Sequence, residues 1–103
     1  MLNISKNVED EKALFTLEGR LDTLTAADLE EQIRDSLEGV TELTLDLEKL
    51  EYISSAGLRV LLSAWKMMDA KQGGMKLVRV NETVMETLEI THFSEILNIE
   101  TAF

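Results

Sequence analysis

Few side chains of this sequence can do covalent chemistry, and the most informative of them are two adjacent serines. The chain has no cysteine and a single histidine, His92, which excludes disulfides, thiolate metal sites, thiol catalysis and histidine metal clusters. Ser54 and Ser55 stand where a strand-like run gives way to a helix-like run. A helix N-terminus has unpaired backbone N–H groups and the positive end of the helix dipole, so it accepts a capping hydroxyl or an anion. Capping and modification are therefore both open to these serines.

The helix that follows the serines gives their side chains different directions. Projected at 100° per residue, its apolar residues span an arc of about 220°, which predicts that Leu61 and Trp65 lie in the core. The remaining narrow arc carries the polar residues Ser55, Arg59, Ser63 and Lys66. Ser54 projects toward the apolar side. Ser55 is therefore the serine expected to face outward, with Arg59 one turn along on the same face.

Charge also distinguishes this helix. The 103 residues carry a formal net charge of −10, yet residues 56–72 hold three basic side chains against one acidic, a sum of +2, which leaves −12 elsewhere. Such an acidic chain disfavours nucleic acid and anionic membrane surfaces as partners. A phosphoryl group on Ser55 would add about −1.5 to −2 of charge and cancel the basic face. The sequence shows no secretory signal and no run of about 18 apolar residues, so we expect a cytoplasmic protein.

Hydrophobic periodicity predicts one α/β domain with a mixed sheet. Alternating apolar residues indicate strands over residues 2–8, 13–17, 41–47, 75–80 and 96–99. Helical spacing and cap residues indicate helices that begin near Thr25, near Ala56 and after Asn81. The order β-β-α-β-α-β-α-β implies an opening hairpin followed by parallel neighbours. We expect strand 41–47 to be central, with the helices packed mainly on one face of the sheet.

Two runs of residues resemble the STAS domains of anti-sigma factor antagonists. The first is Gly19-Arg20-Leu21-Asp22-Thr23, and the second extends from Asp46 through Leu61, with Ser55 two residues before Gly57. The resemblance covers nearly the whole chain. It implies a single STAS domain over residues 1–103, with a STAS-like sandwich as its fold.

The resemblance implies a phosphorylation-regulated antagonist without catalysis, cofactor or metal. In this family the serine at the position of Ser55 is phosphorylated by the partner anti-sigma factor, a serine kinase with a GHKL-type ATPase fold. The unmodified antagonist binds that kinase and frees a sigma factor; phosphorylation ends the binding, and a serine phosphatase resets the switch. Such compact antagonists usually act as monomers. The implied partner-binding residues are Asp22, Thr23, Ser54, Ser55, Ala56, Gly57 and Arg59.

Departures from the family pattern leave alternatives open. Many members carry Asp where this chain has Ser54, which makes Ser54 a second candidate for phosphorylation. A different function would be a STAS scaffold that is never phosphorylated, or a module that binds a small anionic ligand at the helix N-terminus. An enzyme is disfavoured, because no general base stands near Ser55 in the sequence and G-x-S-x-G is absent. Asp46 is expected to face outward from a strand rich in leucine.

Overall fold

The computed structural model describes residues 1–103 and contains one sheet with the strand order β1-β2-β3-β4-β5. β1 is antiparallel to β2, and every later pair of neighbours is parallel. The elements are β1 (Leu2–Glu9), β2 (Lys12–Leu21), α1 (Thr23–Ser36), β3 (Glu42–Ile53), α2 (Ser55–Ala70), β4 (Gly74–Val80), α3 (Glu82–Ile90), a 3₁₀ turn (Phe93–Glu95) and β5 (Asn98–Thr101). The predicted element order, mixed sheet and central β3 are confirmed.

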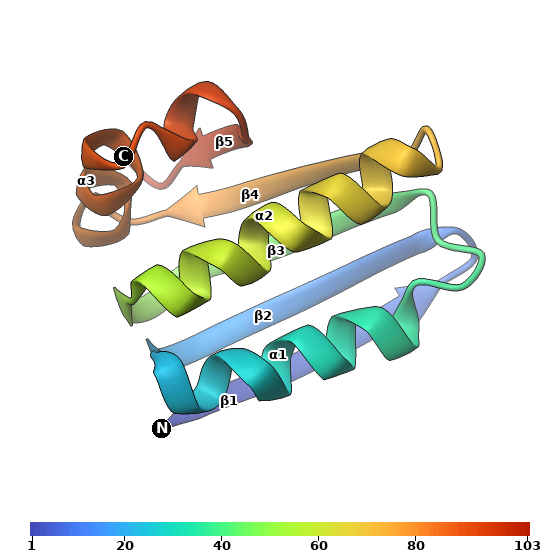
Figure 1. Ribbon diagram of the computed structural model, residues 1–103, viewed down its shortest axis with the longest axis horizontal. Coiled ribbons are helices and arrows are strands. Elements are labelled where there is room, and N and C mark those ends of the chain that lie inside the picture. The colour runs from blue at the N-terminus through green and yellow to red at the C-terminus, as the bar shows by residue number, and fades with distance from the viewer.

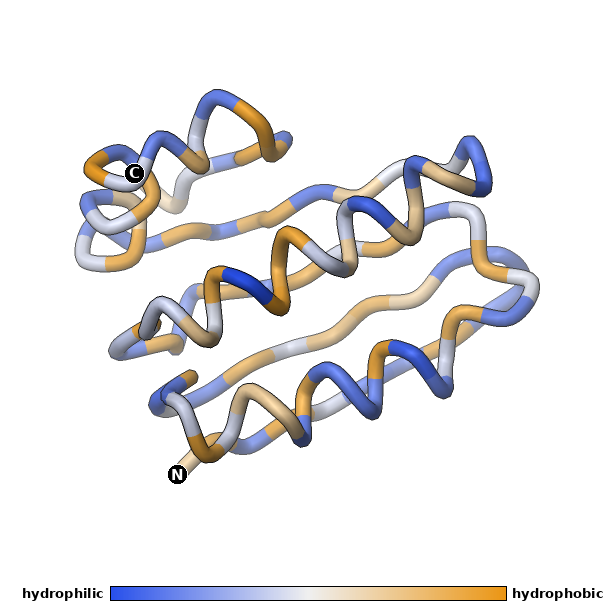
Figure 2. Tube along the Cα trace, viewed as in Figure 1, coloured by the Kyte–Doolittle hydropathy of each residue, from blue (hydrophilic) through white to orange (hydrophobic).

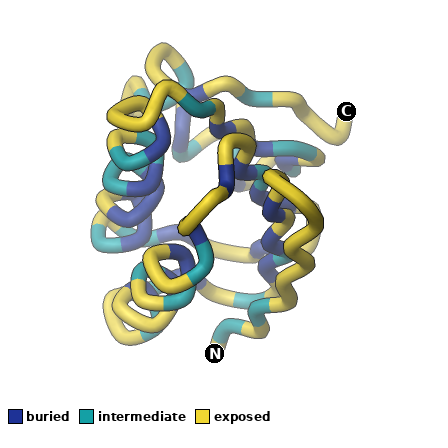
Figure 3. Tube along the Cα trace, turned by 90° about the vertical axis from the view of Figure 1, so that its right-hand side faces the viewer, coloured by how far each residue is buried: buried dark blue, intermediate teal, exposed yellow.

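All three helices lie on one face of the sheet. α1 and α2 run side by side across it, and α3 packs near the end of β3 (Figure 1). Twenty-five buried apolar residues form one cluster between the helices and the sheet. Figure 2 shows the apolar stretches along β2, β3 and α2, and in Figure 3 the buried residues lie where the helices face the sheet. None of the helices is long and apolar enough to cross a lipid bilayer.

The apolar arc of α2 is only partly covered. Leu61 is fully buried, at 0% exposure, whereas Trp65 is half-buried and packs against the margin of the core. The prediction that Trp65 belongs to the core is therefore wrong. A helix lying on one face of a sheet turns only part of its circumference inward, so an arc of about 220° cannot all be buried there.

Several element boundaries differ from those that the sequence predicted. α1 begins at Thr23 with Asp22 as its N-cap, and Thr25 occupies the third position of the helix. β3 extends to Ile53, beyond the expected end at residue 47. β2 continues to Leu21, beyond the expected end at residue 17, and contains Gly19 with a φ of 110° next to a shift in register. Glycine tolerates this positive φ, so the strand bends there and continues.

The face of the sheet that the helices leave open holds one buried carboxylate. Asp46 faces away from the leucines of β3, as expected, but it is only 6% exposed because Arg79 lies over it. The Nε of Arg79 donates to Oδ2 of Asp46 at 2.9 Å, and Oδ1 accepts from the amide of Glu48 at 3.1 Å. Arg79 has a left-handed φ of 50° at a bulge of β4, where Leu77 and Val80 both turn inward.

Core placement of α2 predicts unequal effects for two neighbouring leucines. Leu61→Ala is expected to lower the free energy of unfolding by about 2–5 kcal/mol, because it leaves a cavity in a fully buried site. Leu62→Ala is the matched control, since Leu62 is only half-buried, and its cost should be clearly smaller. Urea denaturation followed by circular dichroism measures both; equal losses would contradict the orientation of the helix.

Candidate functional site at the N-termini of two helices

Parallel pairing of β2 with β3 brings the starts of α1 and α2 together. Leu21 at the end of β2 lies opposite Ile53 at the end of β3. The amide of Ser54 donates to the carbonyl oxygen of Leu21 at 2.9 Å. Asp22 and Ser54, which directly follow the paired strands, are the N-caps of α1 and α2. Both helices thus begin at the same end of the sheet (Figure 1).

The two serines have different roles in this arrangement. Ser54 has an extended backbone and is half-buried, and its Oγ accepts a hydrogen bond from the amide of Gly57 at 3.2 Å. Ser55 is the first residue of α2, is exposed, and its hydroxyl makes no hydrogen bond within the chain. The capping function thus occupies one hydroxyl and leaves the other available at the surface.

The surroundings of Ser55 favour a negative charge. The amides of Ser55 and Ala56 lie in the first turn of α2, where no preceding helical carbonyl can accept from them. The positive end of the helix dipole is at the same place. Arg59 is exposed one turn further along α2. No carboxylate lies in the first turn of this helix to neutralise it.

Gly57 permits the close approach of α2 to the strand ends. A Cβ at this position would lie 2.7 Å from Cγ of Leu21 and 3.0 Å from Cγ1 of Ile53, which is closer than carbon atoms pack. Any larger residue would push the start of α2 away from the sheet. Gly57, which was predicted as a partner-binding residue, is buried, and it positions the exposed residues around it.

Asp22 is held by a capping box at the start of α1. Its Oδ1 accepts from the amides of Leu24 and Thr25, each at 3.0 Å, and its own amide donates to the hydroxyl of Thr25 at 2.9 Å. The hydrogen bond from the Thr25 amide is the main cause that lowers the pKa of Asp22 below its usual value, against a smaller opposing effect of desolvation. Thr23, the next residue, is exposed as the first residue of α1.

A contact between Arg20 and Tyr52 lies beside these caps and was not predicted from the sequence. The guanidinium carbon of Arg20 lies 4.3 Å from the centre of the Tyr52 ring, a cation–π contact between paired residues of β2 and β3. Both side chains are exposed one residue before the end of their strands. The presence of an arginine and a tyrosine does not by itself indicate this contact. The contact depends on the register between β2 and β3, which the sequence does not reveal.

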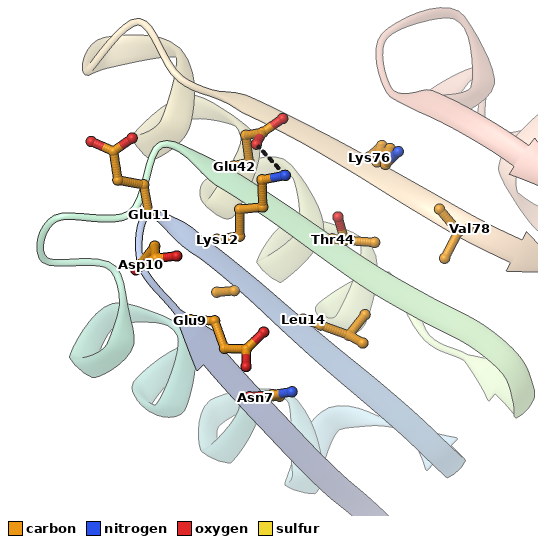
Figure 4. Close-up of a pocket in the computed structure, with 11 residues that line it drawn as sticks. Asn7, Glu9, Asp10, Glu11, Lys12, Leu14, Glu42, Thr44, Lys76 and Val78 are labelled. Atoms are coloured by element: carbon orange, nitrogen blue, oxygen red, sulfur yellow. Dashed lines mark ion pairs between the residues drawn. The ribbon is translucent and has the colours of Figure 1, made fainter.

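The largest groove of the molecule is remote from Ser55. It lies on the open face of the sheet, has a volume of about 610 Å³, and is shown in Figure 4. Glu9, Asp10, Glu11 and Glu42 line it, and Lys12 forms an ion pair with Glu42 at 3.6 Å. This excess of carboxylates would repel an anionic ligand. No group of three or more His, Cys, Asp or Glu side chains is arranged to hold a metal ion.

Comparisons with known proteins identify the family. The family model of the STAS domain matches residues 3–103. The chain belongs to the STAS domain family. It is 34% identical over 91 residues to BtrV of Bordetella bronchiseptica, which is described as an anti-sigma factor antagonist; the match covers 87% of this chain and 78% of BtrV. It is 30% identical to the anti-sigma-B factor antagonist of Listeria monocytogenes, with 80% of this chain and 73% of that protein covered.

Solved structures of STAS proteins share the fold. The anti-sigma factor antagonist SpoIIAA in its unphosphorylated form aligns with a TM-score of 0.76 and 18% identity, over 96% of this chain and 87% of SpoIIAA. An anti-sigma factor antagonist from Mycobacterium paratuberculosis aligns with a TM-score of 0.83 and 21% identity, over 97% of this chain and 86% of that one. The predicted family and fold are confirmed. STAS antagonists are regulatory binding proteins, so the prediction that the chain is not an enzyme is also confirmed.

The lowered pKa of Asp22 predicts a specific loss of stability in acid. A carboxyl group with a lower pKa in the folded state stabilises the fold above its unfolded pKa of about 3.9, and this contribution disappears as the pH falls through the folded pKa. Asp22→Asn keeps a capping oxygen but cannot titrate. The free energy of unfolding of the wild type should therefore fall more steeply below about pH 4 than that of Asp22→Asn. Parallel curves would contradict the capping account.

Proposed function

We propose that this chain is a phosphorylation-regulated anti-sigma factor antagonist. In the unphosphorylated state it binds an anti-sigma factor serine kinase of the GHKL-type ATPase fold, and the sigma factor is released. Transfer of a phosphoryl group to Ser55 ends this binding, and a serine phosphatase restores the first state. The naming of the curated relatives as anti-sigma factor antagonists supports the partner class. We propose that the chain works as a single, monomeric domain in the cytoplasm.

The observation that carries this proposal is the difference between the two serines. Ser55 offers an exposed hydroxyl with no competing hydrogen bond, at a helix start where the backbone favours an anion. Ser54 is half-buried and engaged as the cap of α2. A kinase therefore reaches Ser55 without disturbing the helix, whereas modification of Ser54 would remove the cap. This favours Ser55 over Ser54, despite the missing Asp that many family members carry at position 54.

Charge and bulk at the surface explain how phosphorylation would end binding. A phosphoryl group adds about −1.5 to −2 of charge beside Arg59, on the only helix whose net charge is positive. Thr23 and Arg59, in the first two turns of α1 and α2, are exposed, and the caps Asp22 and Ser54 are half-buried. A partner surface formed against these residues in the neutral state would meet a dianion after modification. The buried core lies beneath this surface and need not rearrange.

The alternative functions are a scaffold that is never phosphorylated and a module that binds a small anion at the N-terminus of α2. The large groove on the open face of the sheet offers no second anion site, because its lining is acidic. Each alternative would use the exposed start of α2 at Ser55, as the phosphorylated switch does. Only a measurement of phosphorylation at Ser55 therefore distinguishes them from the switch.

Phosphorylation of matched serine variants tests the proposal. The wild type, Ser54→Ala and Ser55→Ala are incubated with ATP and the anti-sigma factor kinase that co-purifies from the native cell, and intact mass is measured. Wild type and Ser54→Ala should gain one phosphoryl group, and Ser55→Ala should gain none. Ser54→Ala should also lose about 1 kcal/mol of stability as a lost N-cap, which confirms that its hydroxyl is structural.

Binding to the kinase is measured with the same set and with Ser55→Asp. Ser55→Ala should bind like the wild type, and Ser55→Asp should bind clearly more weakly. Incorporation that stops in Ser54→Ala but continues in Ser55→Ala would move the site to Ser54. No incorporation in any variant, with the kinase active on itself or on another substrate, would favour the scaffold.

A further inference from the structure

The last stretch of β3 has a strand on only one side. β3 pairs with β4 from Glu42 to Asp46, whereas its pairing with β2 continues to Ile53. Backbone carbonyls of residues 47–53 that point toward β4 therefore have no strand partner, and such groups need another donor. Ser54 and Ser55 follow directly. The position of the loop that carries them depends on what holds this free edge.

The side-chain amide of Asn81 takes the place of the missing strand. The two N–H groups of its Nδ2 donate, one of them shared between two acceptors, to the carbonyl oxygens of Leu47 and Glu48, both at 3.1 Å, and of Leu50 at 2.8 Å. Its Oδ1 accepts from the amide of Val84 at 2.9 Å and so caps α3. The Asn81 side chain thus donates to carbonyl oxygens of β3 that have no strand partner and accepts from a backbone amide at the start of α3.

A neighbouring ion pair fixes Asn81 relative to β3. Arg79, two residues earlier, binds Asp46 through Nε and also contacts Glu48, with its NH1 3.4 Å from Oε1. Its left-handed backbone lies at the bulge where β4 leaves β3. Val80, which stands between Arg79 and Asn81 in the sequence, is fully buried. The last residues of β4 are therefore anchored on both faces of the sheet, Arg79 on the open face and Val80 in the core, and Asn81 follows them at the free edge.

We propose that Asn81 is the positioning residue of the junction between β3 and α2, residues 53–55, which we call the Ser55 loop. Its three hydrogen bonds to β3 hold the stretch that ends at Ser54, and its cap on α3 makes that helix part of the same unit. Loss of the three bonds should loosen the loop while the rest of the sheet stays intact. The inference deepens the proposed function, because the loop it positions is the proposed site of phosphorylation.

Exchange of backbone amides with deuterium in the unmodified chain tests this proposal. Asn81→Ser keeps an oxygen that can cap α3 but removes the donors to Leu47, Glu48 and Leu50. Glu86→Gly is the control, because it weakens α3 at an exposed position and leaves the Asn81 amide in place. The quantity compared is the exchange rate of the Ser54 amide, which donates to Leu21, divided by that of the Leu45 amide, in the part of β3 that pairs with both β2 and β4.

Asn81→Ser should raise this ratio about tenfold, the effect expected from losing hydrogen bonds of ordinary net strength, whereas Glu86→Gly should leave it nearly unchanged. An unchanged ratio in Asn81→Ser, or an equal rise in Glu86→Gly, overturns the proposal. The measurement needs neither kinase nor partner. A failure to phosphorylate Ser55 would refute the proposed function and leave this result standing, so the two failures are distinguishable.

Discussion

Parallel pairing between β2 and β3 is the constraint on which the site depends. It sets Leu21 opposite Ile53, so the residues after the two strands cap two helices side by side. The positive ends of both helix dipoles then lie at the same end of the sheet. The carboxylate of Asp22 neutralises the first, whereas the hydroxyl of Ser54 caps the second without charge. The unmodified chain therefore leaves one helix start able to stabilise an added anion, and Ser55 stands there.

Packing supports this end of the sheet without burying Ser55. Gly57 lets α2 rest against the ends of both strands, because no larger residue fits beside Leu21. Along the edge of β3 that faces β4, the side-chain amide of Asn81 donates hydrogen bonds to carbonyl oxygens that β4 leaves unpaired. Every buried polar side chain has a partner, so no unmet hydrogen bond drives the loop toward another arrangement. The surface around Ser55 can therefore gain a negative charge without a change in fold.

Local patterns in the sequence were sufficient for the order of the elements and for the orientation of the two serines. The alternation in residues 41–47 located the central strand, and the helical projection of residues 54–66 placed Ser55 outward, where the structure shows it exposed. Features that depend on register were not predictable. The start of α1 was predicted near Thr25, three residues after its N-cap Asp22, because threonine is also a common N-cap residue. The Arg20–Tyr52 contact and the three bonds of Asn81 join residues about 30 apart in the sequence, and no local signal indicates such pairs.

Phosphorylation of Ser55, as proposed, would act at the surface of a fold that is already complete. Amide chemical shifts of the unmodified chain and of the chain phosphorylated at Ser55, recorded by two-dimensional ¹H–¹⁵N NMR, test this. We expect changes confined to the two caps and the first turns of α1 and α2, with the amides in the middle of β2, β3 and β4 unchanged. Changes that spread through those core strands would contradict this expectation, because phosphorylation would then act by refolding the domain.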